Sequence, residues 1–417
     1  MINSALAAII GLSLSIFLII KKMAPVYALI LGAVTGGLLS GWSVQDTCGH
    51  MIEGVKDITP AILRILAAGV LTGMLIRTKA AERIAQSIIS TLGQKYVYLA
   101  VAISTMLLTL TGVFIDVAVI TVAPIAILAG AKAGLDRNRM LLALIGGGKC
   151  GNIISPNPNT IISAENFNAP LSSVMGTNIV PAIIGLAVTV FIVINLMPAR
   201  NPMLNSTDEN TSSDNLPPLW SSLAGPLVAI ILLALRPLAG ISIDPMIALP
   251  VGGIAGIVAT GEWKNSSHCL KYGLEKMAPI AILLVGTGTI AGIIKASEIK
   301  ELLVDLISQW NVGGTLIATL SGALMSAATA STTAGATIAS ASFADVITAT
   351  GISAVWGAAL VNSGATILDH LPHGSFFHAT GGSLGMNVKE RLKLIPYETL
   401  TGFVLALSGI IWCMILA

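Results

Sequence analysis

The side chains best suited to bind a ligand lie at four polar interruptions of otherwise apolar sequence. Two are short tips, at 111–116 and 326–333, and two are longer, at 146–160 and 362–375. The interruption at 146–160 contains two prolines within three residues, which cannot continue a helix. Helix ends offer free N–H groups and a positive dipole to an anion. Nearby hydroxyls and amides could hydrogen-bond a polyol, and unwound carbonyls could hold a cation.

We expect the substrate to contact the glycine, hydroxyl, amide and ionisable residues of these interruptions. They are Thr111, Gly112, Asp116, Lys149, Asn152, Ser155, Asn157, Asn159, Thr160, Ser326, Thr329, Ser331, Thr332, Thr333, Asn362, Ser363, His370, His373 and Ser375. For the small residues on the helices flanking the tip at 326–333, close helix packing is the alternative interpretation.

Five ionisable residues could also carry a proton or neutralise charge. Asp116 stands in an apolar run, where a buried carboxyl holds a proton more readily than in water; it could equally be a structural partner for another helix. Histidine titrates near physiological pH, so His370 and His373 could relay protons beside Asp369. A zinc site or a purely structural role are the rival interpretations. Lys149 could neutralise a substrate carboxylate, snorkel, or pair with Asp116. The candidates for cation coupling are Asp116, Asp369, His370 and His373.

The composition places these residues in a membrane protein. Of 417 residues, 54% are hydrophobic and 10% are charged, whereas soluble domains carry about 25% charged residues. A net charge of +2 does not suggest a nucleic-acid partner. The four scattered cysteines are interpreted as packing residues, and no cofactor or metal is expected beyond a coupling ion, H⁺ or Na⁺. The apolar start lacks a basic n-region and a cleavage site, so we interpret it as a retained span.

Apolar stretches long enough to cross a bilayer recur along the chain. We predict crossing helices near 2–20, 24–41, 58–77, 140–163, 178–198, 221–240, 244–260, 278–295, 354–380 and 396–416. Two further stretches, 96–130 and 313–347, are interrupted by the short tips and are predicted to be re-entrant hairpins. Twelve full spans are the alternative, because a hairpin and a pair of spans both return the chain to the same side.

Basic residues set the orientation, because they are retained on the cytoplasmic side. With the N-terminus outside, the inner segments hold sixteen Lys and Arg residues and the outer segments hold four, while Arg64 and Lys149 fall within spans. Both termini are therefore predicted to be periplasmic, with a cytoplasmic linker at 201–220.

The two sides of that linker resemble each other. Pro25 and Gly36 recur 220 positions later as Pro245 and Gly256, and Gly54, Pro60, Gly69 and Gly73 recur 219 positions later as Gly273, Pro279, Gly288 and Gly292. Five crossings in each half would insert the second copy upside down, as in many transporters. The predicted fold is thus an all-α polytopic membrane protein with two inverted-topology repeats. The repeats span 1–200, with hairpin 96–130 and broken helix 140–163, and 221–417, with hairpin 313–347 and broken helix 354–380. Coincidence among common membrane glycines and prolines is the alternative.

These residues resemble the gluconate permease (GntP) family of the ion transporter superfamily along nearly the whole chain. The family has an acid-containing tip, which 115–117 with Pro124 resembles, and a hydroxyl-rich tip, which 326–329 with 333–335 resembles. It also has two polar breaks that contain proline or histidine. The first is similar to 156–159 with 167–168, and the second to 369–373 before 376–377. This chain departs from the family pattern with Asp at 116 for Glu, Asn at 157 for His, and His at 373 for Asp. The departures fall in the presumed site, so the exact substrate does not carry over.

The resemblance implies proton-coupled uptake of sugar acids, related hydroxy acids or, in some members, D-serine, with an elevator-like motion and a homodimer. We therefore expect a symporter, with H⁺ favoured as coupling ion, that moves a small organic anion such as gluconate across a bacterial inner membrane in contact with lipid. A Na⁺-coupled dicarboxylate or citrate carrier, or an exchanger, is the nearest alternative. An intramembrane enzyme using Asp369, His370 and His373, or a channel, is less favoured.

Overall fold

The computed structural model describes residues 3–199, 202–203, 216–239, 241, 243–298, 313–372 and 374–416. Within these ranges the chain is helical, apart from turns and one isolated bridge between Asp136 and Pro202. The all-α prediction is therefore confirmed for the described residues. One predicted site residue, His373, and most of the predicted linker at 201–220 lie outside them.

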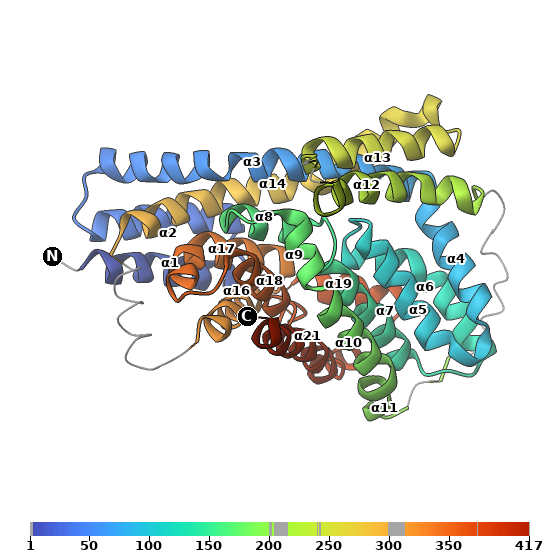
Figure 1. The fold of residues 1–417 in the computed structure, drawn as a ribbon. Coiled ribbons are helices and arrows are strands. Elements are labelled where there is room, and N and C mark those ends of the chain that lie inside the picture. The colour runs from blue at the N-terminus through green and yellow to red at the C-terminus, as the bar shows by residue number, and fades with distance from the viewer. Residues whose placement is uncertain are drawn as a thin grey trace.

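Six helices form a frame along one side of the molecule (Figure 1). They are α1 (Ser4–Ile20), α2 (Pro25–Leu39), α3 (Val44–Arg77), α12 (Leu219–Ala239), α13 (Pro245–Ala259) and α14 (Ser266–Ala296), the last preceded by the short turn Trp263–Asn265. Both α2 and α13 begin at a proline, which suits the first helical position because its missing N–H needs no partner there.

The centre of the frame is the pair α3 and α14, which lie side by side over most of their length. A Cβ added at Gly54 would collide with the backbone of Gly288, and one added at Gly73 would collide with that of Cys269. Glycine at these positions therefore permits the close approach. Helices α1 and α2 pack at one end of the pair, and α12 and α13 pack at the other (Figure 1).

The remaining helices lie beneath the frame. In the first half of the chain they are α4 (Ala80–Leu92), the turn Gln94–Tyr96, α5 (Val97–Leu110), α6 (Ile115–Lys132), α7 (Arg137–Asn152), α8 (Pro158–Asn166), α9 (Leu171–Thr177), α10 (Ile179–Val188), the π-helical turn Thr189–Val193 and α11 (Ile194–Leu196). In the second half they are α16 (Gly314–Thr329), α17 (Thr332–Ala349), α18 (Ala354–Gly364), α19 (Ser375–Ser383), α20 (Val388–Leu392) and α21 (Ile395–Leu416).

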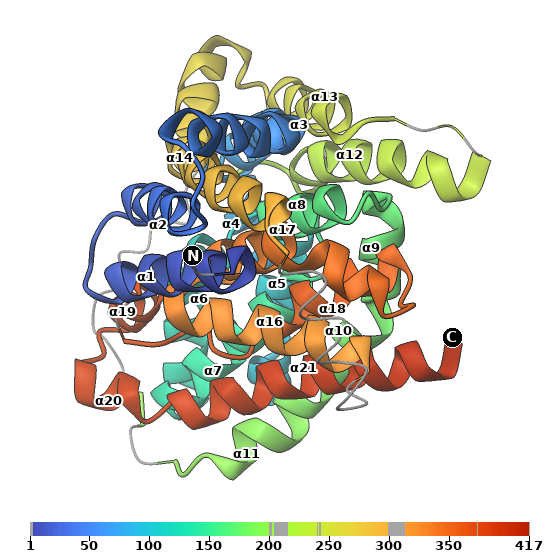
Figure 2. The same cartoon turned by 90° about the vertical axis from the view of Figure 1, so that its left-hand side faces the viewer.

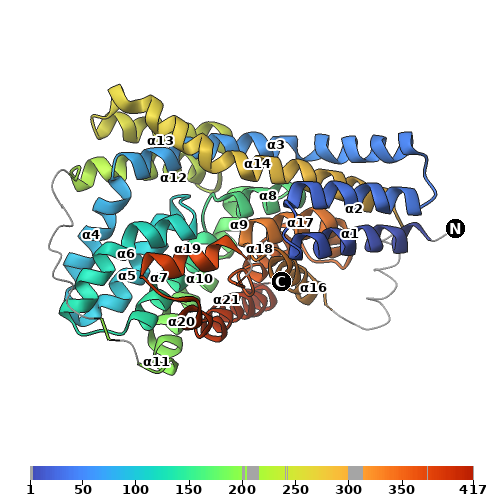
Figure 3. The same ribbon diagram turned by 180° about the vertical axis from the view of Figure 1, so that it is seen from behind.

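The polar interruptions at 146–160 and 362–375 are called the first and the second break. We call α5–α8 together with α16–α19 the tip-and-break bundle. Figure 3 shows its first half, α5 to α7, beneath the α12–α13 end of the frame, and its second half, α16 to α18, nearer to α1 and α2. Figure 2 shows α21 on the far side of the molecule from α3 and α13. The largest hydrophobic core joins the two layers, with Ile65 and Met74 of α3 and Leu141 of α7 among its buried members.

Several predicted helix bounds were wrong. Helices α3 and α14 are 34 and 31 residues long, so the predicted spans 58–77 and 278–295 missed their polar first turns. The side chain of Ser43 caps α3 by accepting from the N–H of Asp46, which starts the helix well before its apolar part. The predicted span 178–198 is interrupted by the π-helical turn, and α4 and α9 were not predicted at all.

By length and apolar composition, five described helical segments could cross a membrane. They are Val44–Arg77, Ile115–Lys132, Leu171–Leu196, Trp263–Ala296 and Val388–Leu416. Shorter apolar helices, α1, α2, α5, α13 and α16 among them, add to these. The described chain therefore has the helices of a multi-pass membrane protein.

Candidate functional site

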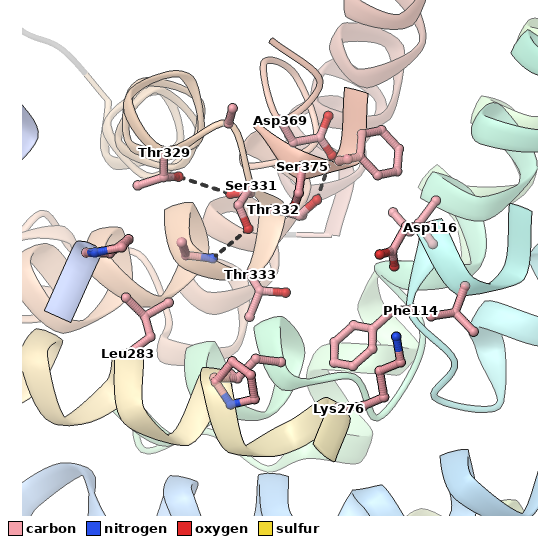
Figure 4. Close-up of a pocket in the computed structure, with 18 of the residues that line it drawn as sticks. Phe114, Asp116, Lys276, Leu283, Thr329, Ser331, Thr332, Thr333, Asp369 and Ser375 are labelled. Carbon is pink, nitrogen blue, oxygen red and sulfur yellow. Dashed lines mark hydrogen bonds between the residues drawn. The ribbon is translucent and has the colours of Figure 1, made fainter. Parts of the chain in front are cut away.

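A cavity of about 540 Å³ lies between the frame and the two hairpin tips of the bundle. Figure 4 shows side chains from both tips, from the second break and from α14 around it. Its walls include Phe114, Ile115, Asp116 and Val117 from the first tip, Thr329 to Ala334 from the second, Asn152, Asp369, Ser375 and Phe376 from the broken helices, and Pro25, Val26, Lys276, Pro279 and Leu283 from the frame. The two tips, 210 or more residues apart in sequence, thus meet at one site.

Each tip is a tight turn between two helices. In the first, Gly112 has a φ of +98°, a conformation that glycine adopts without strain, and α6 begins three residues later. Asp116 therefore lies in the first turn of α6, where the helix dipole favours a negative charge. Its side chain is half-buried at the cavity wall rather than fully buried as the apolar run suggested.

The second tip brings hydroxyl groups to the cavity. Ser331 caps α17 by accepting from the N–H of Ala334 at 3.3 Å. The hydroxyl of Thr329 donates to the carbonyl oxygen of Met325 at 2.9 Å. Thr332 donates to Oδ2 of Asp369 at 2.6 Å, which ties the tip to the second break (Figure 4).

Behind this contact lies a buried charged cluster formed by Lys149, Asp369 and His370. The ammonium of Lys149 is 2.7 Å from Oδ1 of Asp369, and it donates to the carbonyl oxygen of Thr366 at 2.6 Å. Nδ1 of His370 lies 3.1 Å from both Lys149 Nζ and Asp369 Oδ1. Its Nε2 lies 3.1 Å from the hydroxyl of Thr399. Only Asp369 of the three lines the cavity, so it connects the cavity to the cluster.

A network of amides and hydroxyls joins the two breaks. Asn159 donates from Nδ2 to Oδ1 of Asn362 at 2.7 Å, and Asn362 donates to the hydroxyl of Thr160 at 3.0 Å. Within the first break, Asn157 donates to Oδ1 of Asn152 at 2.6 Å. These side chains are buried, so the network holds the end of α7, the start of α8 and α18 together.

The structure separates the predicted site residues into two sets. Those at the cavity wall are Asp116, Asn152, Thr329, Ser331, Thr332, Thr333, Asp369 and Ser375. Those buried behind it are Thr111, Gly112, Lys149, Ser155, Asn157, Asn159, Thr160, Ser326, Asn362, Ser363 and His370. The suggested pairing of Lys149 with Asp116 is wrong, because Lys149 pairs with Asp369. Substrate contact by either set stays a prediction.

Sequence reasoning missed the contribution of the frame to the cavity. Lys276, Pro279 and Leu283 of α14 line it, together with the aromatic rings of Phe114 and Phe376. The one feature of the sequence that could have indicated this contribution is Pro279, which lies in an apolar span three residues after Lys276.

Ion pairs of two other arginines, Arg391 and Arg64, were also missed. Arg391 is buried and pairs with Glu398, with a 3.0 Å contact between its Nη2 and Oε2, and it also donates to the hydroxyl of Thr380 at 3.3 Å. Arg64 of α3 pairs with Glu165 of α8 and, at 2.8 Å, with Asp244 before α13.

Comparison with known proteins gives matches along almost the entire chain. The model of the GntP family permeases matches residues 3–417. A Haemophilus influenzae protein described as an uncharacterized transporter is 48% identical over 404 residues, which cover 97% of this chain and 96% of that protein. A high-affinity gluconate transporter of Escherichia coli is 22% identical over 437 residues, with 98% of each chain covered. The Gnt-II system L-idonate transporter of Escherichia coli is 22% identical, with 92% of each covered.

A solved structure has the same fold. The YdaH transporter of Alcanivorax borkumensis superposes with a TM-score of 0.63 at 15% identity, covering 88% of this chain and 86% of that one. The family model, the relatives and the apolar helices agree that this is a multi-pass membrane transporter and not an enzyme. The resemblance seen in the sequence is thereby confirmed, and the chain belongs to the GntP family of permeases.

Proposed function

We propose that the protein is an H⁺-coupled symporter that moves a small organic anion, such as gluconate or another sugar acid, across a bacterial inner membrane. The observation that carries the proposal is the cavity between the two tips, which offers hydroxyl groups on one wall and an ammonium group on another. Hydroxyls suit a polyol and a cation suits a carboxylate, and a sugar acid has both. The names of the relatives, which include gluconate and L-idonate transporters, agree with this substrate class.

Contacts within the frame support two inverted repeats. Gly54 packs on Gly288, and Gly69 packs on Gly273. In the second repeat, 219 positions later, Gly273 corresponds to Gly54 and Gly288 corresponds to Gly69. A two-fold axis between α3 and α14 would place each glycine of one pair on its counterpart in the other pair, and so it would produce these two equivalent contacts.

The outer helices of the frame repeat the pattern. A Cβ at Gly11 would collide with the backbone of Gly32, and one at Gly225 would lie 2.9 Å from the carbonyl oxygen of Gly252. Gly252 lies 220 positions after Gly32, whereas Gly225 lies 214 positions after Gly11, so the two crossings share one equivalent glycine. The α1–α2 crossing therefore has a counterpart in α12–α13. We also propose that both termini are periplasmic and that the two tips belong to re-entrant hairpins.

The layering favours an elevator-like motion of the tip-and-break bundle against the frame. The tips and both breaks belong to the bundle, so they could move together with the substrate. Arg64 of the frame and Glu165 of the bundle pair across the boundary, and this contact would have to break in the motion. We expect the frame to form the contacts of a homodimer in the lipid bilayer.

Proton coupling is proposed for the acids at the cavity. Asp116 lines it directly, and Asp369 connects it to the buried Lys149 and His370. Adding a proton to either acid removes a negative charge from the wall that an anion must approach, so proton and anion binding would favour each other.

Uptake by proteoliposomes tests the proposal. Wild-type protein should accumulate labelled D-gluconate when a pH gradient is imposed. Asp116→Asn should abolish this accumulation while leaving gluconate counterflow measurable, because exchange without net proton movement does not require coupling. Proton-driven uptake by Asp116→Asn that matches wild type across a pH series would remove Asp116 from the mechanism.

Na⁺ coupling is the second candidate, and one observation favours it. Oδ1 of Asn157 and Oδ1 of Asn159 are buried in the first break and have no hydrogen-bond partner among the described residues. Carbonyl oxygens of this kind could bind a cation. Uptake that follows a Na⁺ gradient and ignores a pH gradient would replace H⁺ by Na⁺ in the proposal.

A further inference from the structure

Lys276 is the cation that the frame contributes to the cavity. It lies on α14, its side chain is exposed, and it lines the wall that faces the tips. Figure 4 shows its ammonium group directed into the cavity beside Phe114 and toward Asp116. Within the described ranges Lys276 has no ion-pair partner, and its recorded contact is with the ring of Tyr272 at 5.5 Å. Its charge is therefore available to an anion in the cavity.

Two other cationic side chains, Lys149 and Arg64, already form ion pairs. Lys149 is buried against Asp369 at 2.7 Å and does not line the cavity. Arg64 pairs with Glu165 and Asp244 on another face of the frame. Lys149 balances the charge of Asp369, but Asp116 also lines the cavity, and its negative charge opposes the binding of an anion. A carboxylate entering the cavity thus meets one uncommitted cation among the described residues, Lys276.

The corresponding position in the other repeat carries the opposite charge. Lys276 lies three residues before Pro279, and 219 positions earlier Asp57 lies three residues before Pro60. Asp57 forms an exposed ion pair with Lys295 at 2.7 Å. In an inverted repeat these two positions would lie toward opposite faces of the membrane. The frame would then attract an anion on the face of Lys276 and not on the face of Asp57.

From this we infer that Lys276 binds the substrate carboxylate on one side of the membrane only, when the cavity is open as in this structure, while the hydroxyls of the second tip hold the polyol end. The inference rests on the proposed transport of sugar acids. Because Lys276 belongs to the frame, it would lose the substrate once the bundle carries it away. Its effect would therefore be confined to the apparent affinity measured from one face.

The test is labelled D-gluconate exchange by proteoliposomes in which the protein has a single orientation, with the external and internal KM measured separately. Lys276→Gln should raise KM about tenfold on one face, the size of change expected when one charged contact is lost, and leave the other face within about twofold. Lys276→Arg should keep the wild-type value. Lys271→Gln, an exposed lysine of the same helix that does not line the cavity, is the matched control.

A neutral competitor separates charge recognition from general damage. Inhibition by D-sorbitol, which has the hydroxyls but no carboxylate, should be the same in wild type and Lys276→Gln, and both should unfold at similar temperatures in detergent. An equal rise of KM on both faces, or no rise on either, would overturn the inference while leaving gluconate transport intact. Wild-type protein that transports no sugar acid would overturn the proposed function and this inference together.

Discussion

The two helix breaks share a backbone arrangement but differ in chemistry. Gly151 of α7 packs on the backbone of Met106, and Gly364 of α18 packs on that of Thr319, 213 positions later in both cases. With this offset Asn157 of the first break corresponds to His370 of the second. Residues 152–159 of the first break are neutral and include three asparagines, whereas residues 365–374 of the second break include Asp369 and His370.

The same offset relates Lys149 to Asn362, and each of these residues bonds to the break of the other half. Lys149 pairs with Asp369, and Asn362 bonds to Asn159 and Thr160. The repeated backbone therefore brings the breaks together, while the side chains of each copy determine whether the connection is ionic or neutral. Two substitutions test this difference, and a third, at the boundary between the frame and the bundle, gives the effect of a more exposed ion pair; they follow in order of decreasing effect.

Lys149→Met should have the largest effect on stability. It leaves the carboxylate of Asp369 buried, with 2% side-chain exposure, and without its cation. Removing one partner of a buried pair typically lowers the free energy of unfolding by about 3–5 kcal/mol. Thermal unfolding in detergent would measure the loss. The double variant Lys149→Met with Asp369→Asn should recover much of it, and a double variant no more stable than the single one would refute the ionic interpretation.

Asn362→Leu should have an intermediate effect, because the connection it breaks is neutral. It leaves Nδ2 of Asn159 without its acceptor, and an unsatisfied buried group costs about 1–3 kcal/mol. The matched control is Asn195→Leu, since Asn195 makes an exposed bond to the carbonyl oxygen of Phe191. Equal unfolding temperatures for the two variants would mean that the amide network does not stabilise the breaks.

Arg64→Gln should have the smallest effect. Arg64 holds Glu165 at the end of α8, but the two side chains remain 24% and 25% exposed. Solvent screens such pairs, so we expect a loss of no more than about 1 kcal/mol, with a smaller loss at high salt. Lys56→Gln, which removes an exposed pair with Glu53, is the control. A loss as large as that of Lys149→Met would contradict this ranking.

Much of the fold followed from local features of the chain. Low charge and repeated apolar stretches require a lipid environment and therefore helices, because only helices satisfy their own backbone hydrogen bonds there. Pro25 and Pro245 mark helix starts, and the interruptions at 153–157 and 365–374 mark helix ends, because the residue types determine these locally. The four interruptions were correctly identified as the places where polar groups gather.

What the sequence could not decide was which polar group meets which. Lys149 and His370 lie 221 residues apart and are within 3.1 Å of each other, which depends on how α7 packs against the second break. Lys276 reaches the cavity because α14 passes close to both tips, and no pattern within α14 predicts that packing. Residue types and helical periodicity determine where a helix forms and breaks, but side-chain partners depend on the packing of distant helices, which only the tertiary structure decided.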